Sequence, residues 1–470
     1  MKQIETDYLV VGAGASGMAF TDALTSAADV EVVLVDRRHR PGGHWLDAYP
    51  FVRLHQPSAC YGVASRKLGD DRIDETGPNA GCYERATGSE ICDHYQRALE
   101  EDMLPSGKVR FFGMSDYLGQ DAEGHRFVAT LTGEPTIVKV RRKIVDTTYT
   151  EGAIPSRHTP SFEVDPDVTF IPPNDIVDLD AGAFGFTVIG AGKTSMDVCY
   201  WLLDQGVDPD RIRWIRARDA WAIDRARLQP LELVGSALEW QSRIVEEAAG
   251  AEDVFDMFHR LEAHGVFHRI DPSVEPQVMR GATLSTMELE ALRQISNVVR
   301  LGKVRRIGTD RVILDEGSIP SDPGQVYVDC TAPGVPPIQA RPVFEADRIV
   351  TQLVTFGIVP WGAATVGYVE AARDGDEEKN RLCPAVSYPG ELSDMAQTLV
   401  VGLKGPAARM AEPDLVAWNE GCRLNPMRGA MDHLDDPLVQ EALARLAANM
   451  EPALANLERM VAGSLAPASA

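Results

Sequence analysis

A strand-like run, a glycine-rich turn and a helical pattern occur together twice in this chain. Residues 7–24 read DYLVVGAGASGMAFTDAL, and residues 186–203 read FTVIGAGKTSMDVCYWLL. In both segments the β-branched apolar run predicts a buried strand, and the apolar spacing after the glycines predicts a helix. Strand, glycine turn and helix in this order open a dinucleotide-binding domain. The sequence therefore predicts an α/β fold with two Rossmann-like dinucleotide-binding domains.

The first turn carries all three glycines of the GxGxxG pattern. Gly12 permits the tight turn, Gly14 lets the backbone approach a pyrophosphate, and Gly17 lets the helix pack closely on the strand. Ala15 and Ser16 stand at the helix N-terminus, whose amides would face the phosphate charge. Because a strand and a helix flank it, the turn indicates a nucleotide site rather than a structural glycine loop.

Two further features indicate which nucleotide the first turn binds. The next predicted strand, 31–35, ends at Asp36, whose carboxylate can accept hydrogen bonds from a ribose and would repel a 2′-phosphate. The residues that follow are Arg37 and then Gly42, Gly43, His44 and Trp45 of the PGGHW turn. A second glycine pair gives backbone room beside an extended ligand, which an NAD-only domain does not need. We expect FAD here; the alternative is a surface loop with a chance Gly-Gly.

The second turn differs from the first at its third glycine and after its second strand. Gly190 and Gly192 repeat the first two glycines, but Ser195 takes the third place, where a small side chain still permits close packing. The position that matches Asp36 holds Arg216, with Arg218 two residues on. Arginine pairs well with a 2′-phosphate, so NADPH is predicted over NADH, with Lys193 and Thr194 as further contacts. The alternative is that both arginines form a solvated strand end.

Charge and cysteine content narrow the classes of function. The formal net charge of -24 argues against nucleic acid or an anionic membrane as a partner, since both need a basic face. The seven cysteines form no CxxC pair, which indicates neither a disulfide framework nor a zinc site and fits a reducing cytoplasm. No signal peptide is expected before the first strand. The uncharged stretch 349–369 contains Pro360 and three glycines, so we interpret it as strand, turn and buried helix rather than a membrane span.

We expect the chain to form a discontinuous first nucleotide domain, residues 1–180 and 320–400, and a second one, residues 181–319. A helix at 89–101, capped by Ser89, is predicted in the first domain. A mostly helical insertion, about 228–300, interrupts the second, and Ser285 or Thr286 has the spacing to cap one of its helices. The tail, 401–470, is rich in Ala and Leu at helical spacing and predicts packing helices with a frayed end.

The order of these motifs resembles the two-dinucleotide-binding flavoproteins, and within them the class B flavin monooxygenases, over roughly residues 5–375. That group includes flavin-containing monooxygenases, N-hydroxylases and Baeyer–Villiger enzymes. The resemblance implies FAD on the first unit, NADPH on the second, and crossings between the domains at 146–150 and 329–334. It also implies that Trp361, at the start of the last helix of the FAD domain, faces the flavin.

The resemblance implies an amide side chain near the reactive face of the flavin, and Gln56 is closest to that position. Gln56 and the neighbouring His55 are therefore the candidate catalytic residues, and Gln56 is counted among the FAD-binding residues as well. The alternative for Gln56 is a polar loop residue. A lone histidine in a loop is more often structural than a proton carrier.

Two departures from the group's pattern bear on oxygen chemistry. An FxGxxxH fingerprint normally precedes the second turn, but residues 161–179 read SFEVDPDVTFIPPNDIVDL, without the glycine or the histidine. Asn174 is the nearest substitute for that role. The other departure is Ser195, which is mild because some N-hydroxylases use small residues there.

The implied function is an FAD-dependent, NADPH-using monooxygenase-like oxidoreductase that acts on a small organic molecule with oxygen in the cytoplasm. Nucleic-acid, membrane and metal partners are not expected, and a homodimer is allowed. One alternative is an NAD(P)H-dependent flavoprotein reductase or dehydrogenase without oxygen insertion, although no paired cysteines favour a disulfide reductase. The other is a non-catalytic nucleotide-binding protein. The substrate is not readable, because the helical insertion is better explained by packing than by a dedicated pocket.

Overall fold

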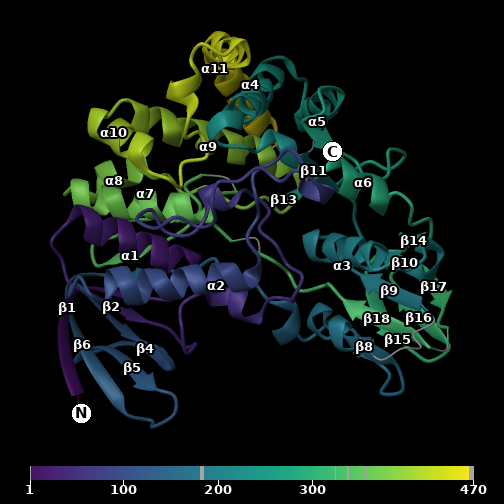
Figure 1. Ribbon diagram of the computed structural model, residues 1–470, viewed down its shortest axis with the longest axis horizontal. Coiled ribbons are helices and arrows are strands. Elements are labelled where there is room, and N and C mark those ends of the chain that lie inside the picture. The colour runs from purple at the N-terminus through teal and green to yellow at the C-terminus, as the bar shows by residue number, and fades with distance from the viewer. Residues whose placement is uncertain (1, 180–184, 323, 336–337, 356, 465–470) are drawn as a thin grey trace.

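The computed structural model describes residues 2–179, 185–322, 324–335, 338–355 and 357–464. Figure 1 shows an α/β part with the N-terminus, a second α/β part beside it, and a layer of helices across the top of both. Each α/β part contains a sheet with parallel strands around one of the two glycine turns. The predicted fold class is confirmed: two Rossmann-like units with inserted helices and a helical C-terminal region.

The first sheet is built around β1 (Lys2–Val11). Its order is β3-β2-β1-β6-β5-β4, with β19 paired to β6. The parallel neighbours are β2 (Val32–Val35), β3 (Val109–Phe112), β6 (Pro135–Asp146) and β19 (Arg348–Val350), and the antiparallel strands are β4 (Ser115–Asp121) and β5 (Gly124–Ala129). All four residues of β2 are buried, as expected for a parallel strand covered on both faces.

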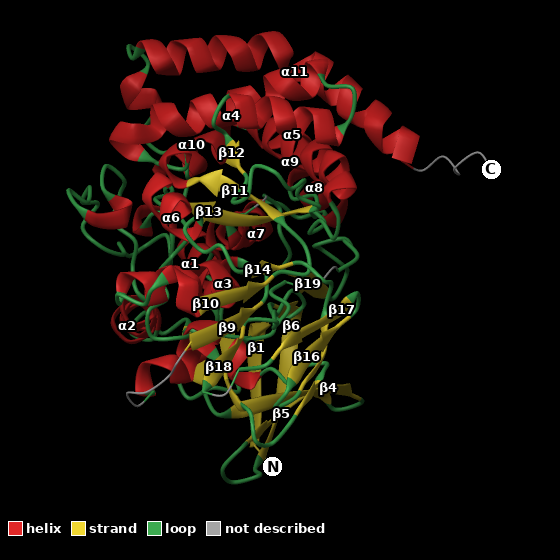
Figure 2. Cartoon of the chain, turned by 90° about the vertical axis from the view of Figure 1, so that its right-hand side faces the viewer, coloured by secondary structure: helices red, strands yellow, loops and turns green. Residues whose placement is uncertain are grey.

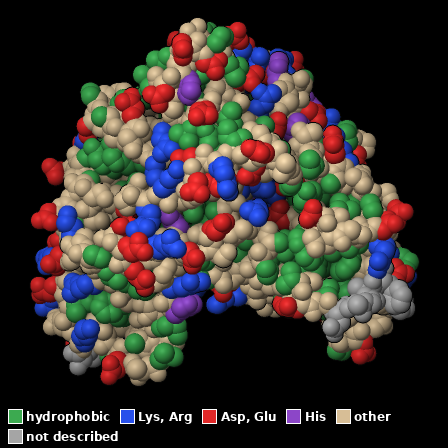
Figure 3. Space-filling model, in the orientation of Figure 1, with side chains coloured by type: hydrophobic (Ala, Val, Ile, Leu, Met, Phe, Trp, Pro, Cys, Tyr) green, Lys and Arg blue, Asp and Glu red, His purple; other side chains and the backbone are tan. Residues whose placement is uncertain are grey.

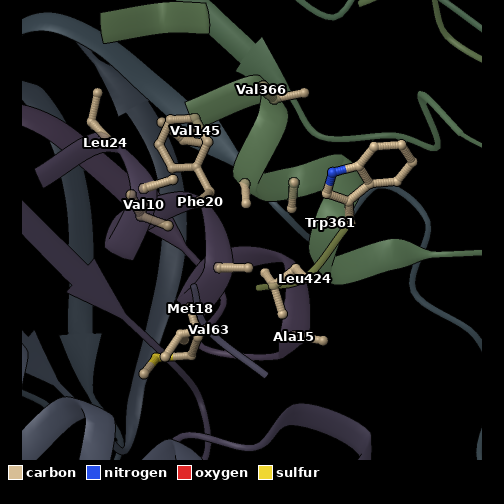
Figure 4. Packing of buried hydrophobic residues seen from close by; sticks show 14 of the residues in the cluster. Val10, Ala15, Met18, Phe20, Leu24, Val63, Val145, Trp361, Val366 and Leu424 are labelled. Atoms are coloured by element: carbon tan, nitrogen blue, oxygen red, sulfur yellow. The ribbon is translucent and has the colours of Figure 1, made fainter. Parts of the chain in front are cut away.

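Helices α1 (Ala15–Ala27) and α7 (Val359–Ala372) pack against each other over this sheet. Their contact is close because Gly367 has no side chain: a Cβ there would lie 2.6 Å from the carbonyl oxygen of Phe20. Figure 4 shows Phe20 from α1 beside Val10 and Val145 from the strands beneath. This apolar core fixes the helix that begins at the first glycine turn.

The second sheet has the order β14-β10-β9-β18-β8, and all its pairs are parallel. Its strands are β8 (Thr169–Ile171), β9 (Gly185–Ile189), β10 (Ile212–Ile215), β14 (Val298–Val299) and β18 (Gln325–Asp329). Helices α3 (Lys193–Asp204) and α6 (Thr286–Leu292) belong to this unit. A smaller sheet joins β7 (Glu163–Val164), β15 (Val304–Ile307), β16 (Arg311–Leu314) and β17 (Gly317–Pro320).

The strand pairing agrees with the crossings that the resemblance implies at 146–150 and 329–334, but not with domain limits at 180 and 320. Strands β7 and β8 precede residue 180 but pair with strands of the second unit, and β18 follows residue 320 and pairs with β9. The chain therefore leaves the first sheet after β6 and returns to it at β19. Short strands such as β8 carry too little apolar pattern to reveal their sheet, because pairing depends on distant partners.

The helical layer joins two segments that the sequence analysis treats separately (Figure 2). Helices α4 (Val234–Gly250) and α5 (Val254–Ala263) come from the insertion, whereas α9 (Met395–Met410) and α11 (Pro437–Ser464) come from the tail. Trp221, Phe258, Leu403 and Leu457 share one apolar core between them. The insertion is less helical than predicted, because β12 (Phe267–His268) and β13 (Val278–Leu284) pair with β11 (Ala220–Asp224). The remaining helices are α8 (Asp376–Leu382) and α10 (Pro413–Gly421).

Two predicted helix starts can be compared with the structure. Helix α2 (Gly88–Arg97) is capped by Thr87, which forms a capping box with Glu90, so the prediction of Ser89 is wrong by two residues. Ser285 caps α6 and forms a capping box with Glu288, as its spacing predicts.

The stretch 349–369 contains the end of β19 and most of α7. Among the described residues, no helix has the length and apolar character needed to cross a bilayer. The frayed end, 465–470, lies outside the described residues.

Candidate nucleotide-binding sites

The first turn is closed so tightly that two of its positions exclude a side chain. Gly12 has φ +102°, and a Cβ there would lie 2.5 Å from Thr147 Oγ1. A Cβ on Gly17 would lie 1.9 Å from the carbonyl oxygen of Gly12. The first and third glycines therefore make the turn and the helix-to-strand contact, as the GxGxxG pattern predicts.

Gly14 and Gly43 bring the first turn and the PGGHW turn into backbone contact. A Cβ on Gly43 would lie 2.8 Å from Gly14 Cα, and the amide of Gly42 donates a 3.0 Å hydrogen bond to the carbonyl of Ala13. A Cβ on Gly14, in contrast, would make only van der Waals contacts among the described residues, with Gly43 Cα at 3.4 Å and Gly43 N at 4.0 Å. The structure thus brings the two glycine motifs together into one bare backbone surface.

Helix α1 starts from Gly14 and helix α3 starts from Gly192, and neither helix has a side-chain cap or an acidic residue in its first turn. The first amides of a helix have no partner within the helix, and they favour negative charge. Side-chain caps are present at α2, α5 and α6, whereas α4, α7 and α9 lack them as α1 and α3 do. The amides that Ala15, Ser16 and Thr194 present at the two turns are thus suited to phosphate oxygens.

Asp36 lies at the end of β2 beside the first turn. Its Oδ2 accepts a 2.6 Å hydrogen bond from the amide of Ala13, and its Oδ1 accepts one of 2.7 Å from the amide of Arg38. A carboxylate has about four acceptor positions, so two remain for ribose hydroxyls. Arg37, the next residue, is exposed and pairs with Glu151 from the crossing segment.

The second turn repeats this construction with a different third residue. Gly190 has φ +139°, and a Cβ there would lie 2.4 Å from the carbonyl oxygen of Cys330. Ser195 is fully buried, and its hydroxyl donates a 2.7 Å hydrogen bond to the carbonyl of Gly192. A serine side chain therefore fits at the position where the first unit needs glycine, and its hydrogen bond to Gly192 stabilises the turn. Apart from its chain neighbours and the backbone of its own helix, no atom of the residues that the structure describes lies within 4 Å of a Cβ built on Gly192, which leaves that side open to a ligand.

Each glycine turn is backed by an Asp-x-Thr segment from the neighbouring strand. Thr148 donates to Asp146 Oδ1 through its amide at 2.9 Å and its hydroxyl at 2.8 Å. Thr331 does the same to Asp329 Oδ1 at 2.9 and 2.6 Å. These segments follow β6 and β18, which lie beside β1 and β9. The internal repeat therefore extends from the glycine turns to the segments that cross between the units.

The two arginines that follow β10 differ in burial and in their ion-pair partners. Arg216 has a side chain only 1% exposed, lies over the Trp214 ring at 4.6 Å, and pairs with Asp219 at 2.8 Å. Arg218 is 42% exposed and pairs with Glu391 at 2.6 Å. Arg300, which the sequence analysis missed, lies at the end of the neighbouring β14 and shares Asp219 with Arg216 at 2.9 Å. Its place on a distant strand gives it no motif, so only the pairing of β14 with β10 could have revealed it.

Lys193, at the start of α3, belongs to a chain of contacts between the two units. It pairs with Asp197 one helical turn on, and Asp197 Oδ2 accepts a 2.7 Å hydrogen bond from the hydroxyl of Tyr49. Burial opposes the charge of Asp197, but Lys193, His55 and Tyr49 together hold its pKa below the usual range. Tyr49 and Asp197 carry no sequence motif, so the sequence alone predicts neither as a site residue.

A buried charged cluster surrounds His55 next to the second turn. Arg85 and Arg225 both pair with Glu288, the first at 3.6 Å, and all three side chains are nearly inaccessible. Burial raises the pKa of Glu288, but Lys193, Arg225 and Arg85 outweigh it and hold that pKa below the usual range. With Lys193 and Asp197 the cluster holds three cations and two anions. This local positive excess beside Gly192 favours an anionic ligand in an otherwise acidic protein.

The two candidate catalytic residues lie at the edge of this cluster. Desolvation lowers the pKa of His55 to about 4, and Lys193 lowers it further than Asp197 raises it. His55 is therefore neutral at neutral pH, and its backbone carbonyl accepts a 3.0 Å hydrogen bond from Thr283. Gln56 is half-buried, and its side chain makes no hydrogen bond with any residue that the structure describes. Neither contact assigns a chemical role, so both roles stay predictions.

Three other predicted residues have clear surroundings. Trp361 is 8% exposed and donates a 3.0 Å hydrogen bond to Asn419 from the C-terminal helices. Figure 4 shows it in the apolar core near Leu424. Asn174 donates a 3.1 Å hydrogen bond to the carbonyl of Asp47, a structural contact. In the PGGHW turn, His44 is exposed with its ring 4.9 Å from that of Trp45.

The two α/β units stand apart at their free ends. Figure 3 shows the molecule hollowed between them on the side opposite the helical layer. The glycine turns begin α1 and α3, one on each unit (Figure 1). Within the described residues, no group of three or more His, Cys, Asp or Glu is arranged to hold a metal ion. The two glycine turns thus each begin a helix, one in each unit.

Comparison with known families and proteins gives three findings. Residues 10–55, which include the first turn, Asp36 and the PGGHW turn, match the family described as NAD(P)-binding Rossmann-like domain. An uncharacterized protein of Mycobacterium tuberculosis is 44% identical over 447 residues, which is 95% of this chain and 82% of that protein. An uncharacterized protein of Mycobacterium bovis matches with the same identity and coverage.

Solved structures also match, at lower similarity. Cyclohexanone monooxygenase from Rhodococcus sp. Phi1 bound to NADP+ is 13% identical, with 79% of this chain and 85% of that chain covered and a TM-score of 0.47. A flavin-containing monooxygenase from Stenotrophomonas maltophilia is 15% identical, with 89% and 99% covered and a TM-score of 0.44.

Proposed function

We propose that this chain, which belongs to one family with the uncharacterized mycobacterial proteins, is an FAD-dependent, NADPH-using oxidoreductase of the monooxygenase type. FAD would occupy the first turn and NADPH the second. The substrate would be a small organic molecule that reacts with reduced flavin and oxygen. A cytoplasmic location remains part of this proposal.

One observation carries the proposal: each of the two units begins a helix, without a side-chain cap, at a bare glycine turn. Gly14 and Gly192 leave room where a pyrophosphate would approach, whereas the neighbouring positions Gly12, Gly17 and Gly190 are closed by the protein itself. This difference is what a dinucleotide needs from a Rossmann turn. Asp36 with free acceptor positions supports a ribose without a 2′-phosphate at the first turn.

The residues of this chain would bind and orient the two nucleotides. FAD, when bound, would supply the hydride- and electron-transfer chemistry. The amides at Ala15, Ser16 and Thr194 would bind phosphates, and Lys193 and Arg85 would add positive charge at the second turn. His55 is neutral at neutral pH because its pKa is about 4. The neutral ring can therefore donate or accept a hydrogen bond, but it is not in the charged imidazolium form.

The preference for NADPH over NADH is tested at the two arginines after β10. We expect Arg218→Ala to raise the KM for NADPH about tenfold, because a charge-assisted contact to the 2′-phosphate is worth about 1.5 kcal/mol. The KM for NADH should stay unchanged. Arg216→Ala should affect NADPH as well and should also lower the unfolding midpoint, since Arg216 is buried against Asp219. Equal effects on NADPH and NADH would contradict the assignment of a 2′-phosphate site.

The use of oxygen is tested by a two-stage reaction. The protein is first reduced by NADPH without oxygen and is then mixed with oxygenated buffer while the flavin absorbance is followed. A monooxygenase-type enzyme should show a transient flavin–oxygen spectrum that differs from both the reduced and the oxidised form. Monophasic reoxidation without such a transient would contradict oxygen insertion.

One observation favours the rival assignment, an NAD(P)H-dependent flavoprotein reductase. The segment 161–179 lacks the group's fingerprint, and Asn174 is held by the carbonyl of Asp47. A reductase would reduce an artificial electron acceptor rapidly while showing only monophasic reoxidation. The same two-stage experiment therefore separates the two assignments.

A further inference from the structure

Residues 47–55 form a strap that follows the PGGHW turn and lies against the second unit. Asp47 accepts hydrogen bonds at its carbonyl from Ser156 at 2.8 Å and from Asn174 at 3.1 Å. Phe51 stacks on Trp201 of α3 with ring centroids 4.8 Å apart and planes at 15°. The strap thus follows directly from the PGGHW turn, which contacts the first glycine turn. It packs on α3, the helix that begins at the second glycine turn.

A buried hydrogen bond joins Tyr49 of the strap to Asp197 of α3. Tyr49 is 6% exposed, and its hydroxyl lies 2.7 Å from Asp197 Oδ2. Asp197 also pairs with Lys193, the first residue of α3. Desolvation and Asp197 raise the pKa of Tyr49 well above its usual value, so the phenol stays protonated, whereas Asp197 stays ionised. The hydrogen bond is therefore charge-assisted, which makes it stronger than one between neutral groups.

We propose that Tyr49 and Asp197 are positioning residues that fix the two nucleotide sites relative to each other. The inference rests on the proposed function for its kinetic consequence. Tyr49 continues from the turn that contacts Gly14, and Asp197 lies one helical turn after the N-terminus of α3. Hydride transfer needs the two reacting rings at close and defined separation. A bond between these two segments would hold that separation.

The chain contains a matched control for this bond. Tyr8 donates a 2.8 Å hydrogen bond to Glu370, and Glu370 pairs with Lys379 at 2.6 Å. This second Tyr–carboxylate–Lys group is also buried, but all its members lie in the first unit or its covering helices. Tyr8→Phe and Tyr49→Phe therefore remove the same kind of bond, and only Tyr49→Phe removes it between the two units.

A cofactor-independent test measures the separation of the units directly. Cysteines are introduced at the exposed positions Leu131 and Gln205 and are spin-labelled. The label should react selectively with them, because the seven native cysteines are buried. Dipolar EPR then gives the distance distribution between the units. Tyr49→Phe should widen that distribution. Tyr8→Phe should leave it narrow, and so should Asp197→Asn, because the amide oxygen still accepts from Tyr49.

The kinetic test measures flavin reduction at saturating NADPH in a single turnover. Tyr49→Phe should lower this rate by about tenfold to a hundredfold, the cost of misplacing reactants by about 1 Å. FAD content and the rate of reduction by dithionite, which bypasses the second site, should not change. An unchanged distance distribution and rate in Tyr49→Phe, or equal effects of Tyr8→Phe, would overturn the inference. If no FAD binds, the proposed function fails, and the EPR measurement still decides whether the strap positions the units.

Discussion

Gly14→Val is expected to weaken FAD binding about 100-fold while the protein stays folded. Gly14 has φ -81°, so valine adopts its backbone without strain, and a Cβ there makes only van der Waals contacts with Gly43 among the described residues. The added methyl groups would project onto the surface where the pyrophosphate approaches. An overlap of this kind costs about 2.7 kcal/mol, which weakens FAD binding about 100-fold. Flavin absorbance of the purified protein and titration of the apoprotein with FAD measure the effect.

The neighbouring glycine serves as the contrast. Gly17→Ala places a Cβ 1.9 Å from the carbonyl oxygen of Gly12, so it should destabilise the folded protein itself by about 3 kcal/mol. Gly14→Val should keep its unfolding midpoint and NADPH binding, whereas Gly17→Ala should lose stability together with FAD. Full retention of flavin in Gly14→Val would contradict the placement of FAD at this turn.

Gly192→Val is expected to block reduction by NADPH while FAD stays bound. Beyond its neighbours along the chain, no atom in the described part of the chain lies within 4 Å of a Cβ at this position, and its φ of -88° is open to valine. The fold should therefore tolerate the change, and only a ligand would meet the side chain. By the same overlap argument, the Kd for NADPH should rise about 100-fold. Stopped-flow reduction at increasing NADPH gives that Kd, and dithionite should still reduce the bound flavin.

Gly375 provides the matched control for this substitution. It is also the residue before a helix, α8, with φ -85° and, its chain neighbours aside, no atom of a described residue within 4 Å of a built Cβ. Gly375→Val should leave FAD content and NADPH reduction unchanged. If Gly192→Val and Gly375→Val behaved alike, the second turn would not be a nucleotide site.

The features that could be predicted from the sequence are the local ones. A strand, a glycine turn and a helix adjoin one another in the chain, so their spacing is visible as a motif at both turns. The role of Gly17, where a Cβ would meet the carbonyl of Gly12, follows from the same local geometry, and the capping box of Ser285 with Glu288 is likewise local. These predictions depend on contacts between residues that are close in the sequence.

What could not be predicted depends on contacts between distant segments. Tyr49 with Asp197, and Arg85 with Glu288, are 148 and 203 residues apart, and no periodic pattern links such pairs. The membership of β8 and β18 in the second sheet likewise depends on pairing between segments that are far apart in the sequence. The surroundings of Trp361 were unpredictable as well, because Asn419 lies in the C-terminal region that the resemblance does not cover.

The central claim is that one chain holds two nucleotides and transfers electrons from the second to the first. The most direct test of this claim is an anaerobic titration of the FAD-loaded protein with NADPH. The reduction of the flavin is monitored through its visible absorbance. The account predicts one FAD per chain, bleached completely by an equimolar amount of NADPH, with Gly192→Val unbleached at that concentration. A chain that binds no FAD, or a bound flavin that excess NADPH leaves oxidised, would contradict it.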